Sequence, residues 1–144
     1  VQERDGDGMS IMTSLRAYQK AGVPMSKLVL GTATYGRSWD VSAASCLGSS
    51  STGGTPACGI FTPAPSAGAA GSCTRQKGVL AYYEILELLK QTGTVAYYND
   101  TLASPYAYAA NGNPWVGYDN PTSIKAKVGL VKKMGLAGAM AWSL

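Results

Sequence analysis

The stretch KLVLGTATYGRSW, residues 27–39, decides the fold. Its first half is apolar or small, which is typical of a strand that is buried on both faces, while its end carries two aromatic rings and a cation. The segment before it, residues 10–21, places Ile11, Leu15 and Tyr18 at helical spacing. A helix that leads through a short loop into a buried strand predicts a parallel sheet.

The end of the chain repeats this order. Asn120 and Pro121 predict the start of a second helix, and Gly135 predicts its end. The stretch GLAGAMAWSL, residues 135–144, then indicates a second strand made of small and apolar residues. Both ends of the chain therefore favour the same helix–strand unit.

The middle of the chain has a different character. The stretch GVLAYYEILELLKQTG, residues 78–93, predicts a helix with Val79, Tyr83, Leu86 and Leu89 on one side. Aromatic-rich runs follow it, and the pair Asn111-Gly112 before the last run indicates a hairpin. We therefore expect an α+β domain with an antiparallel sheet.

Two parallel strands and two helices cannot cover a parallel sheet on both faces. We therefore expect an α/β fold in which the chain is the C-terminal part of a (β/α)8 TIM barrel, which needs about 250 residues when complete. Residues 1–39 and 119–144 are then barrel segments, and residues 40–118 form an inserted α+β domain. The alternative is a complete small α+β domain, although its exposed strand edges would favour aggregation.

The composition excludes several classes of function. Apolar residues make up 46% and charged residues 14% of the chain, which is a globular balance. The net charge of +4 comes mostly from dispersed residues, so we expect no nucleic-acid partner. No apolar run is long enough to cross a membrane. The basic residues that do lie close together are expected on the solvated face of the last helix: Lys125, Lys127, Lys132 and Lys133.

The chain contains no histidine. This excludes Ser–His and Cys–His nucleophiles and most zinc sites, and it leaves carboxylates, Tyr and Lys for acid–base chemistry. We expect neither a metal nor a cofactor. The three cysteines lie in a stretch rich in Gly and Ser, where Cys46 and Cys58 could form a disulfide and Cys73 would be left over. A disulfide would indicate an oxidising compartment, and the alternative is three free thiols.

The ends of the two predicted strands carry the candidate binding residues. Chemistry in barrels gathers at the C-terminal ends of the strands, where this chain has Tyr35, Arg37 and Trp142. An indole ring offers an apolar floor to a sugar ring or a nucleobase, and an Arg offers a planar fork of donors to oxygen atoms. The combination favours carbohydrate, although an isolated Trp is often only structural.

Three stretches in this order resemble family 18 glycoside hydrolases, the chitinases and chitinase-like lectins: KLVLGTATYGRSW, GVLAYYEI and WVGYDNPTSIKAKVGLVKKMGLAGAMAWSL. The resemblance implies that KLVLGTAT is strand 7 of the barrel, that GAMAWSL is strand 8, and that the chitinase insertion domain lies between them. It further implies that Tyr35 and Arg37 contact N-acetylglucosamine units and that Trp142 is the floor of a subsite. The remaining candidate binding residues are Glu84 in the cleft and the pair Tyr118 and Asp119, for which a structural role is the alternative.

The catalytic part of the family pattern is missing from this chain. Family members hydrolyse chitin by a substrate-assisted, retaining mechanism in which a Glu at the end of a D-x-x-D-x-D-x-E motif is the acid, an exception to the scheme with two carboxylates. The motif does not occur here, and the acidic cluster with Asp5 and Asp7 lacks the following Glu. We therefore expect no catalytic residue in the chain.

The resemblance thus implies a secreted protein that hydrolyses chitin or chito-oligosaccharides when intact. This chain would supply a wall of the substrate cleft, and its partner would be the remainder of the barrel. One alternative is a chitinase-like lectin that binds chitin without cleaving it. Another is an isolated insertion-type domain that packs on a different protein.

Overall fold

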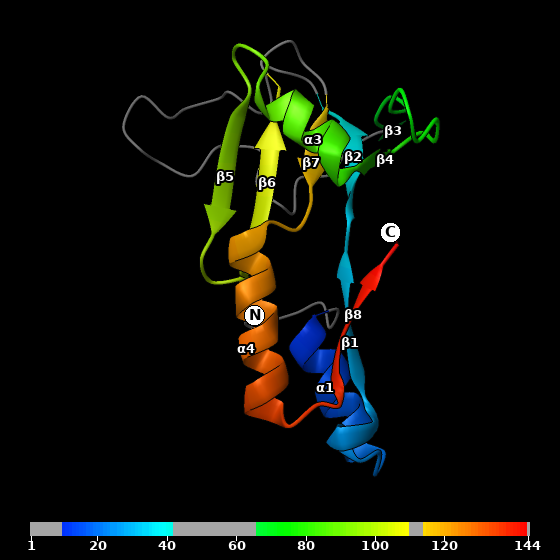
Figure 1. Ribbon diagram of the computed structural model, residues 1–144, viewed down its shortest axis with the longest axis vertical. Coiled ribbons are helices and arrows are strands. Elements are labelled where there is room, and N and C mark those ends of the chain that lie inside the picture. The colour runs from blue at the N-terminus through cyan, green and yellow to red at the C-terminus, as the bar shows by residue number, and fades with distance from the viewer. Residues whose placement is uncertain (1–9, 42–65, 110–113, 144) are drawn as a thin grey trace. The chain divides into compact units, whose positions relative to one another are not determined.

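The computed structural model describes residues 10–41, 66–109 and 114–143, and Figure 1 shows their helices and strands. The fold is α/β, and the chain divides into two compact units. The first unit contains the described residues of the ranges 1–34, 98–104 and 119–144, and the second contains those of the ranges 35–97 and 105–118. The predicted domain roles of these parts stay predictions.

The first unit holds two helices and a pair of strands. Strands β1 and β8 are parallel, and the pairing runs from Val29 opposite Gly138 to Ala33 opposite Trp142. This confirms the predicted parallel pairing of the two helix–strand segments. The elements of this unit are α1 (Ile11–Lys20), the 3-10 helix η1 (Met25–Lys27), β1 (Val29–Ala33), α4 (Pro121–Met134) and β8 (Gly138–Trp142).

Local capping explains where α4 begins and ends. The side chain of Asn120 accepts a hydrogen bond from the backbone N–H of Ser123, and Pro121 occupies the first turn. These contacts satisfy donors that the first turn of a helix leaves unpaired. At the other end Gly135 has φ of 64°, a left-handed conformation that favours glycine. The predicted limits of this helix are confirmed.

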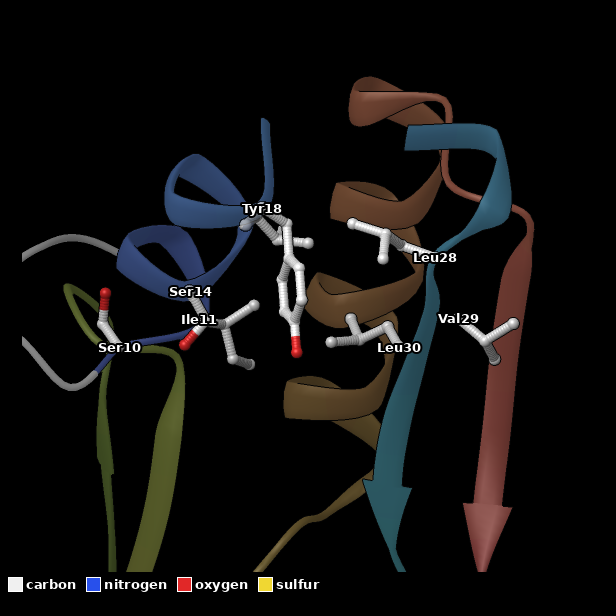
Figure 2. A pocket seen from close by; sticks show the side chains of 8 residues that line it. Ser10, Ile11, Ser14, Tyr18, Leu28, Val29 and Leu30 are labelled. Atoms are coloured by element: carbon white, nitrogen blue, oxygen red, sulfur yellow. The ribbon is translucent and has the colours of Figure 1, made fainter. Parts of the chain in front are cut away.

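The prediction that β1 and β8 are buried is wrong, because no residue of either strand is fully buried and β8 is exposed from Ala139 to Trp142. Figure 2 shows Leu28 and Leu30 pointing toward α1, while Val29 points away from it. On the face of Val29 the exposed fractions are high, with 54% for Val29, 47% for Met140 and 65% for Trp142. We call these three residues the bare face. On the opposite face α1 lies beside Leu28 and Leu30, while Ala139 and Ala141 of β8 are exposed as well.

The second unit is built on an antiparallel sheet with the strand order β3-β2-β7-β6-β5, and β4 pairs with β2 beside this path. Strands β6 and β7 are antiparallel neighbours, as predicted, while the predicted turn at Asn111-Gly112 lies outside the described residues. The elements that lie wholly or mainly in this unit are β2 (Tyr35–Asp40), β3 (Ser66–Ala67), β4 (Val79–Ala81), α3 (Tyr82–Leu89), β5 (Val95–Asn99), β6 (Ser104–Tyr108) and β7 (Trp115–Gly117).

The predicted helix of residues 78–93 is shorter than expected and buries another face. Residues 79–81 form β4, because they pair with β2 through Gly36 and Leu80. Ile85 and Leu88 are the buried side chains of α3, whereas Tyr83 and Leu86, which were predicted to share a face, are 54% and 39% exposed. The pairing of β4 with β2 explains why the helix is shorter and why its buried face differs from the predicted one, since Ile85 lies against Gly36 of β2.

The two faces of the second sheet carry different cores. One face packs against α3 around Ile85, Ala107 and Val116, each of which has no exposed surface. The other face carries a second cluster built on Tyr106 and Trp115. A close approach keeps Gly36 free of a side chain, because a Cβ there would lie 2.7 Å from Ile85 Cδ1.

Candidate functional site

Strand β2 presents two of the predicted binding residues on one open face. Burial alternates along the strand: Gly36 and Ser38 are buried, Tyr35 is half-buried and Arg37 is exposed. The guanidinium carbon of Arg37 lies 5.4 Å from the centre of the Tyr35 ring. At this distance a cation is attracted to the face of a ring, so the two side chains support each other while the donors of Arg37 stay accessible.

These two residues lie in a different element from the one predicted. They were expected at the end of the strand that begins at residue 27, but that strand, β1, ends at Ala33. Tyr35 and Arg37 belong to β2, where they pair with Ala81 and Val79 of β4. Residues 35–40 form a strand of the second unit because residues 35–37 pair with β4, residues 37–39 with β7 and residues 39–40 with β3.

Trp142 lies in the first unit, at the end of β8. Its carbonyl oxygen accepts a hydrogen bond from the backbone N–H of Thr34, and its neighbour on β1 is Ala33. The indole is 65% exposed, so its ring is free to contact a ligand. The predicted sugar contacts therefore form two groups, with Tyr35 and Arg37 in the second unit and Trp142 in the first.

Glu84 makes four hydrogen bonds at the start of α3. The backbone N–H groups of Cys73, Thr74 and Ala81 donate to its carboxylate at 2.7, 3.2 and 2.8 Å, and the Thr74 hydroxyl donates at 3.0 Å. Burial raises the pKa of Glu84, but these hydrogen bonds outweigh it and the net pKa lies below the ordinary value.

The contacts of Glu84 fix a turn rather than leave the carboxylate open to a ligand. The Thr74 hydroxyl has one hydrogen, which it shares between Glu84 and the carbonyl of Val79, also 3.0 Å away, so the turn, β4 and the start of α3 are joined. A Cβ at Gly71 would lie 2.4 Å from both carboxylate oxygens. The predicted role of Glu84 in sugar binding stays a prediction, and what the structure describes is an anchor for β4.

A cavity of about 450 Å³ lies beside this anchor in the second unit. Its walls include Cys73, Tyr83 and Glu84. The Cys73 thiol is exposed and forms no disulfide. A hydrogen bond with the Cys73 side chain, followed by burial and nearby negative charge, raises the pKa of Tyr83 to about 12. The predicted Cys46–Cys58 disulfide lies outside the described residues, as do Asp5 and Asp7.

Asp119 holds the start of α4 in place. Its carboxylate accepts hydrogen bonds from the Ser123 hydroxyl at 2.7 Å and the backbone N–H of Ala33 at 3.4 Å. It also pairs with Lys127, whose Nζ lies 2.5 Å away. The prediction that Lys127 lies on a solvated face is wrong, because its side chain is only 17% exposed. Ion pairs within a helix are predictable at spacings of three or four residues, whereas Asp119 and Lys127 are eight residues apart in the sequence.

Tyr118 is packed within the second unit. Its ring centre lies 6.5 Å from that of Tyr82, and its backbone N–H donates to the carbonyl of Pro105. Burial raises the pKa of Tyr118, with a smaller contribution from Tyr82. A binding role for Tyr118 and Asp119 stays a prediction.

A second cavity, of about 320 Å³, lies between α1 and β1 in the first unit (Figure 2). Side chains such as Ile11, Leu28 and Leu30 make its walls mainly apolar, and Tyr18 reaches into the same space. None of the predicted site residues lines it. Across the described parts of the chain, no cluster of acidic residues and cysteines could hold a metal, and no helix is long and apolar enough to span a membrane.

Comparison with known sequences decides the family. The sequence profile described as Glycosyl hydrolases family 18 matches residues 2–144. The chain belongs to glycosyl hydrolase family 18. Human Chitinase-3-like protein 2 is 39% identical over 123 residues, which is 85% of this chain and 27% of that protein. Chitotriosidase-1 of Mus musculus is 38% identical over 135 residues, or 94% of this chain and 25% of that protein.

Solved structures of a chitinase and of a pseudo-chitinase resemble the chain as well. Human YKL-39, described as a pseudo-chitinase with retained chitooligosaccharide binding, has a TM-score of 0.73 and 35% identity, over 92% of this chain and 32% of that one. A class V chitinase from Nicotiana tobaccum in complex with NAG4 has a TM-score of 0.74 and 30% identity. The match covers 91% of this chain and 33% of the chitinase chain. The chain thus spans about a quarter of the two curated relatives and a third of each solved chain.

Proposed function

We propose that this chain forms part of the chitooligosaccharide-binding cleft of a family 18 protein. Tyr35 and Arg37 of the second unit would contact N-acetylglucosamine units, and the exposed ring of Trp142 in the first unit would offer an apolar surface to sugar. The open row of Tyr35 and Arg37 on β2, held above the buried Gly36 and Ser38, is the observation that carries this proposal. Relatives that bind chitooligosaccharides support the choice of ligand.

We further propose that β1 and β8 are the last two strands of a (β/α)8 barrel and that the second unit is the chitinase insertion domain. Parallel strands normally occur in sheets that are covered on both faces. The bare face of Val29, Met140 and Trp142 would face the interior of such a barrel, and the remainder of the barrel would cover it. The parallel register of β1 and β8 supports this assignment.

The intact protein would hydrolyse chitin by the substrate-assisted, retaining mechanism and would act outside the cell. The acid would come from outside this chain, since the D-x-x-D-x-D-x-E motif is absent from its sequence. A second candidate is a lectin that binds without cleaving, and the retained binding of the pseudo-chitinase YKL-39 favours it. The two candidates differ in the residue at the end of the motif.

Calorimetric titration of the 144-residue chain with chitotetraose tests the binding proposal. We expect saturable binding, a loss of at least about tenfold in affinity for Arg37→Ala, which removes the donor fork, and no binding of cellotetraose, which lacks the N-acetyl groups. A fluorogenic chito-oligosaccharide should release no product above the blank. Equal affinity for both tetrasaccharides would contradict the proposed ligand, and turnover would show that an acid is present in the chain.

A further inference from the structure

The open row on β2 continues beyond Arg37. Trp39 follows two positions later, and side chains at this spacing point to the same face of a strand, about 7 Å apart. Ser38 between them is only 1% exposed, whereas the large ring of Trp39 is 36% exposed. Tyr35, Arg37 and Trp39 therefore form one continuous row on the open face of β2.

The ring of Trp39 is supported from one side by other rings. Its centre lies 5.4 Å from that of Trp115, with 59° between the ring planes. Trp115 is itself 8% exposed and stacks on Tyr106 at 5.7 Å, and Tyr106 stacks on Tyr97 at 5.2 Å. Contact with this buried stack limits the rotation of the Trp39 side chain, so little conformational freedom remains to be lost on binding.

The other side of Trp39 is left open by the neighbouring strand. Strand β3 pairs with β2 there, and the residue opposite Trp39 is Ala67. A methyl group is too short to cover an indole, which explains why more than a third of this side chain stays exposed although the strands on both sides of it are in place. A supported and partly open indole next to an Arg matches the chemistry that recognises the C–H face of a sugar.

We propose that Trp39 is a further sugar-binding residue, an aromatic platform for one N-acetylglucosamine unit beyond those that Tyr35 and Arg37 contact. This inference rests on the proposed function and extends its cleft along β2. The competing explanation is that Trp39 serves only to pack against Trp115. The two explanations differ in how a ligand of increasing length responds when the ring is removed.

Titration of the full 144-residue chain with chitobiose and chitohexaose separates them. Trp39→Leu keeps apolar volume but removes the ring face, so affinity for the hexaose should fall about tenfold while affinity for the biose stays within about twofold. Trp39→Phe retains a ring and should keep most of the hexaose affinity. Tyr83→Leu is the matched control, because it removes a ring on α3 that is more exposed than Trp39, and it should change neither affinity.

A fluorescence measurement gives a second readout that does not depend on Trp39→Leu being folded. In Trp142→Phe the remaining indoles are Trp39 and the buried Trp115. Chitohexaose should shift the emission of this variant, and the shift should disappear when Trp39→Phe is added.

Three results would overturn the inference. Unchanged hexaose affinity in a folded Trp39→Leu variant would show that Trp39 only packs, and so would an emission shift that persists without Trp39. Failure of the unsubstituted chain to bind either oligosaccharide would instead contradict the proposed function itself, and the extended cleft with it.

Discussion

Glu84 and Asp119 show how single carboxylates organise each unit. Glu84 joins a turn, β4 and the start of α3 through four hydrogen bonds, and Asp119 joins α4 to the end of β1. Both residues are part of the family resemblance, which implies a place in the cleft for Glu84 and leaves a binding or a structural role for Asp119. Their observed hydrogen bonds are to protein atoms. They would therefore affect ligand binding indirectly, by holding the neighbouring strands in place.

The first prediction concerns the pH dependence of Glu84. Its pKa is lowered in the folded chain, so its contribution to stability is full above the pKa of the unfolded chain, about 4.3, and is lost as pH falls through the lower folded value. Thermal unfolding between pH 7 and pH 3 should show a steeper loss of Tm below about pH 4.3 for the natural chain than for Glu84→Gln.

The matched control for Glu84 is Glu87→Gln on the same helix. Glu87 pairs with Lys90 at 2.6 Å, but both side chains are more than 60% exposed. Exposed pairs contribute little, so this variant should follow the natural chain over the whole pH range. Identical pH profiles for Glu84→Gln and the natural chain would contradict the anchoring role.

The second prediction concerns the pair of Asp119 and Lys127. Asp119→Asn leaves a Lys with 17% exposure without its counter-charge, and breaking a pair of this kind costs about 3 kcal/mol. Urea unfolding should show a lower free energy of unfolding by this amount. Lys90→Gln breaks the exposed pair of Glu87 and Lys90 and should change the free energy of unfolding by less than about 0.5 kcal/mol. Equal effects of both substitutions would contradict the structural role of Asp119.

At the scale of elements, the sequence was sufficient to predict where a helix begins and ends when contacts within the helix and its flanks determine those limits. The ends of α4 were predictable because a capping Asn120, a Pro121 and a left-handed Gly135 are all written within the helix and its flanks. The start of α3 was not, because residues 79–81 have apolar side chains that suit a helix or a strand. Only their pairing with β2 makes them β4, and that pairing joins residues far apart in the chain.

The same limit explains what was missed in the candidate site. Tyr35 and Arg37 were predicted as binding residues at the end of the strand that begins at residue 27, since nothing local separates β1 from β2. Trp39 was not singled out, because its exposure depends on the small Ala67 of β3 and on the position of Trp115. Because side chains alternate between the two faces of a strand, the sequence of residues 35–39 could have placed Trp39 on the same face as Tyr35 and Arg37.

The third prediction tests the backbone of α4 with two glycines. A Cβ would meet nothing within 4 Å at either Gly129 or Gly135, so contacts cannot distinguish them. Gly129→Ala lies inside the helix and should stabilise it by about 1 kcal/mol. Gly135→Ala places a Cβ at a φ of 64° and should destabilise it by about 1 kcal/mol. Urea unfolding should show shifts of opposite sign, and shifts of the same sign would contradict the assigned conformations.

At the scale of the whole molecule, burial is distributed unevenly between the units. The second unit has two buried clusters, whereas the first unit leaves the apolar side chains of its bare face in contact with water. Exposed apolar patches on this scale mark surfaces that bind something or associate. The remainder of a barrel is the partner that we propose for this one.

The fourth prediction concerns the bare face. Val29→Thr combined with Met140→Thr keeps two residues suited to strands but lowers the apolar character of the surface. We expect weaker binding of an apolar dye such as ANS and less concentration-dependent association in light scattering, while Trp142 is left unchanged. Tyr83→Ser combined with Leu86→Ser, which changes exposed residues on α3, should leave association unaffected. A similar decrease in both variants would indicate a general effect of hydrophobicity.

The pairing of β2 also limits the kind of ligand that its open face can take. At Arg37 and Trp39 both edges of the strand are occupied, by β7 on one side and by β4 or β3 on the other. No backbone donor or acceptor is left there for an incoming chain, so a peptide cannot join as an extra strand. Strand addition is thereby excluded at these positions, and only side chains can select a ligand there.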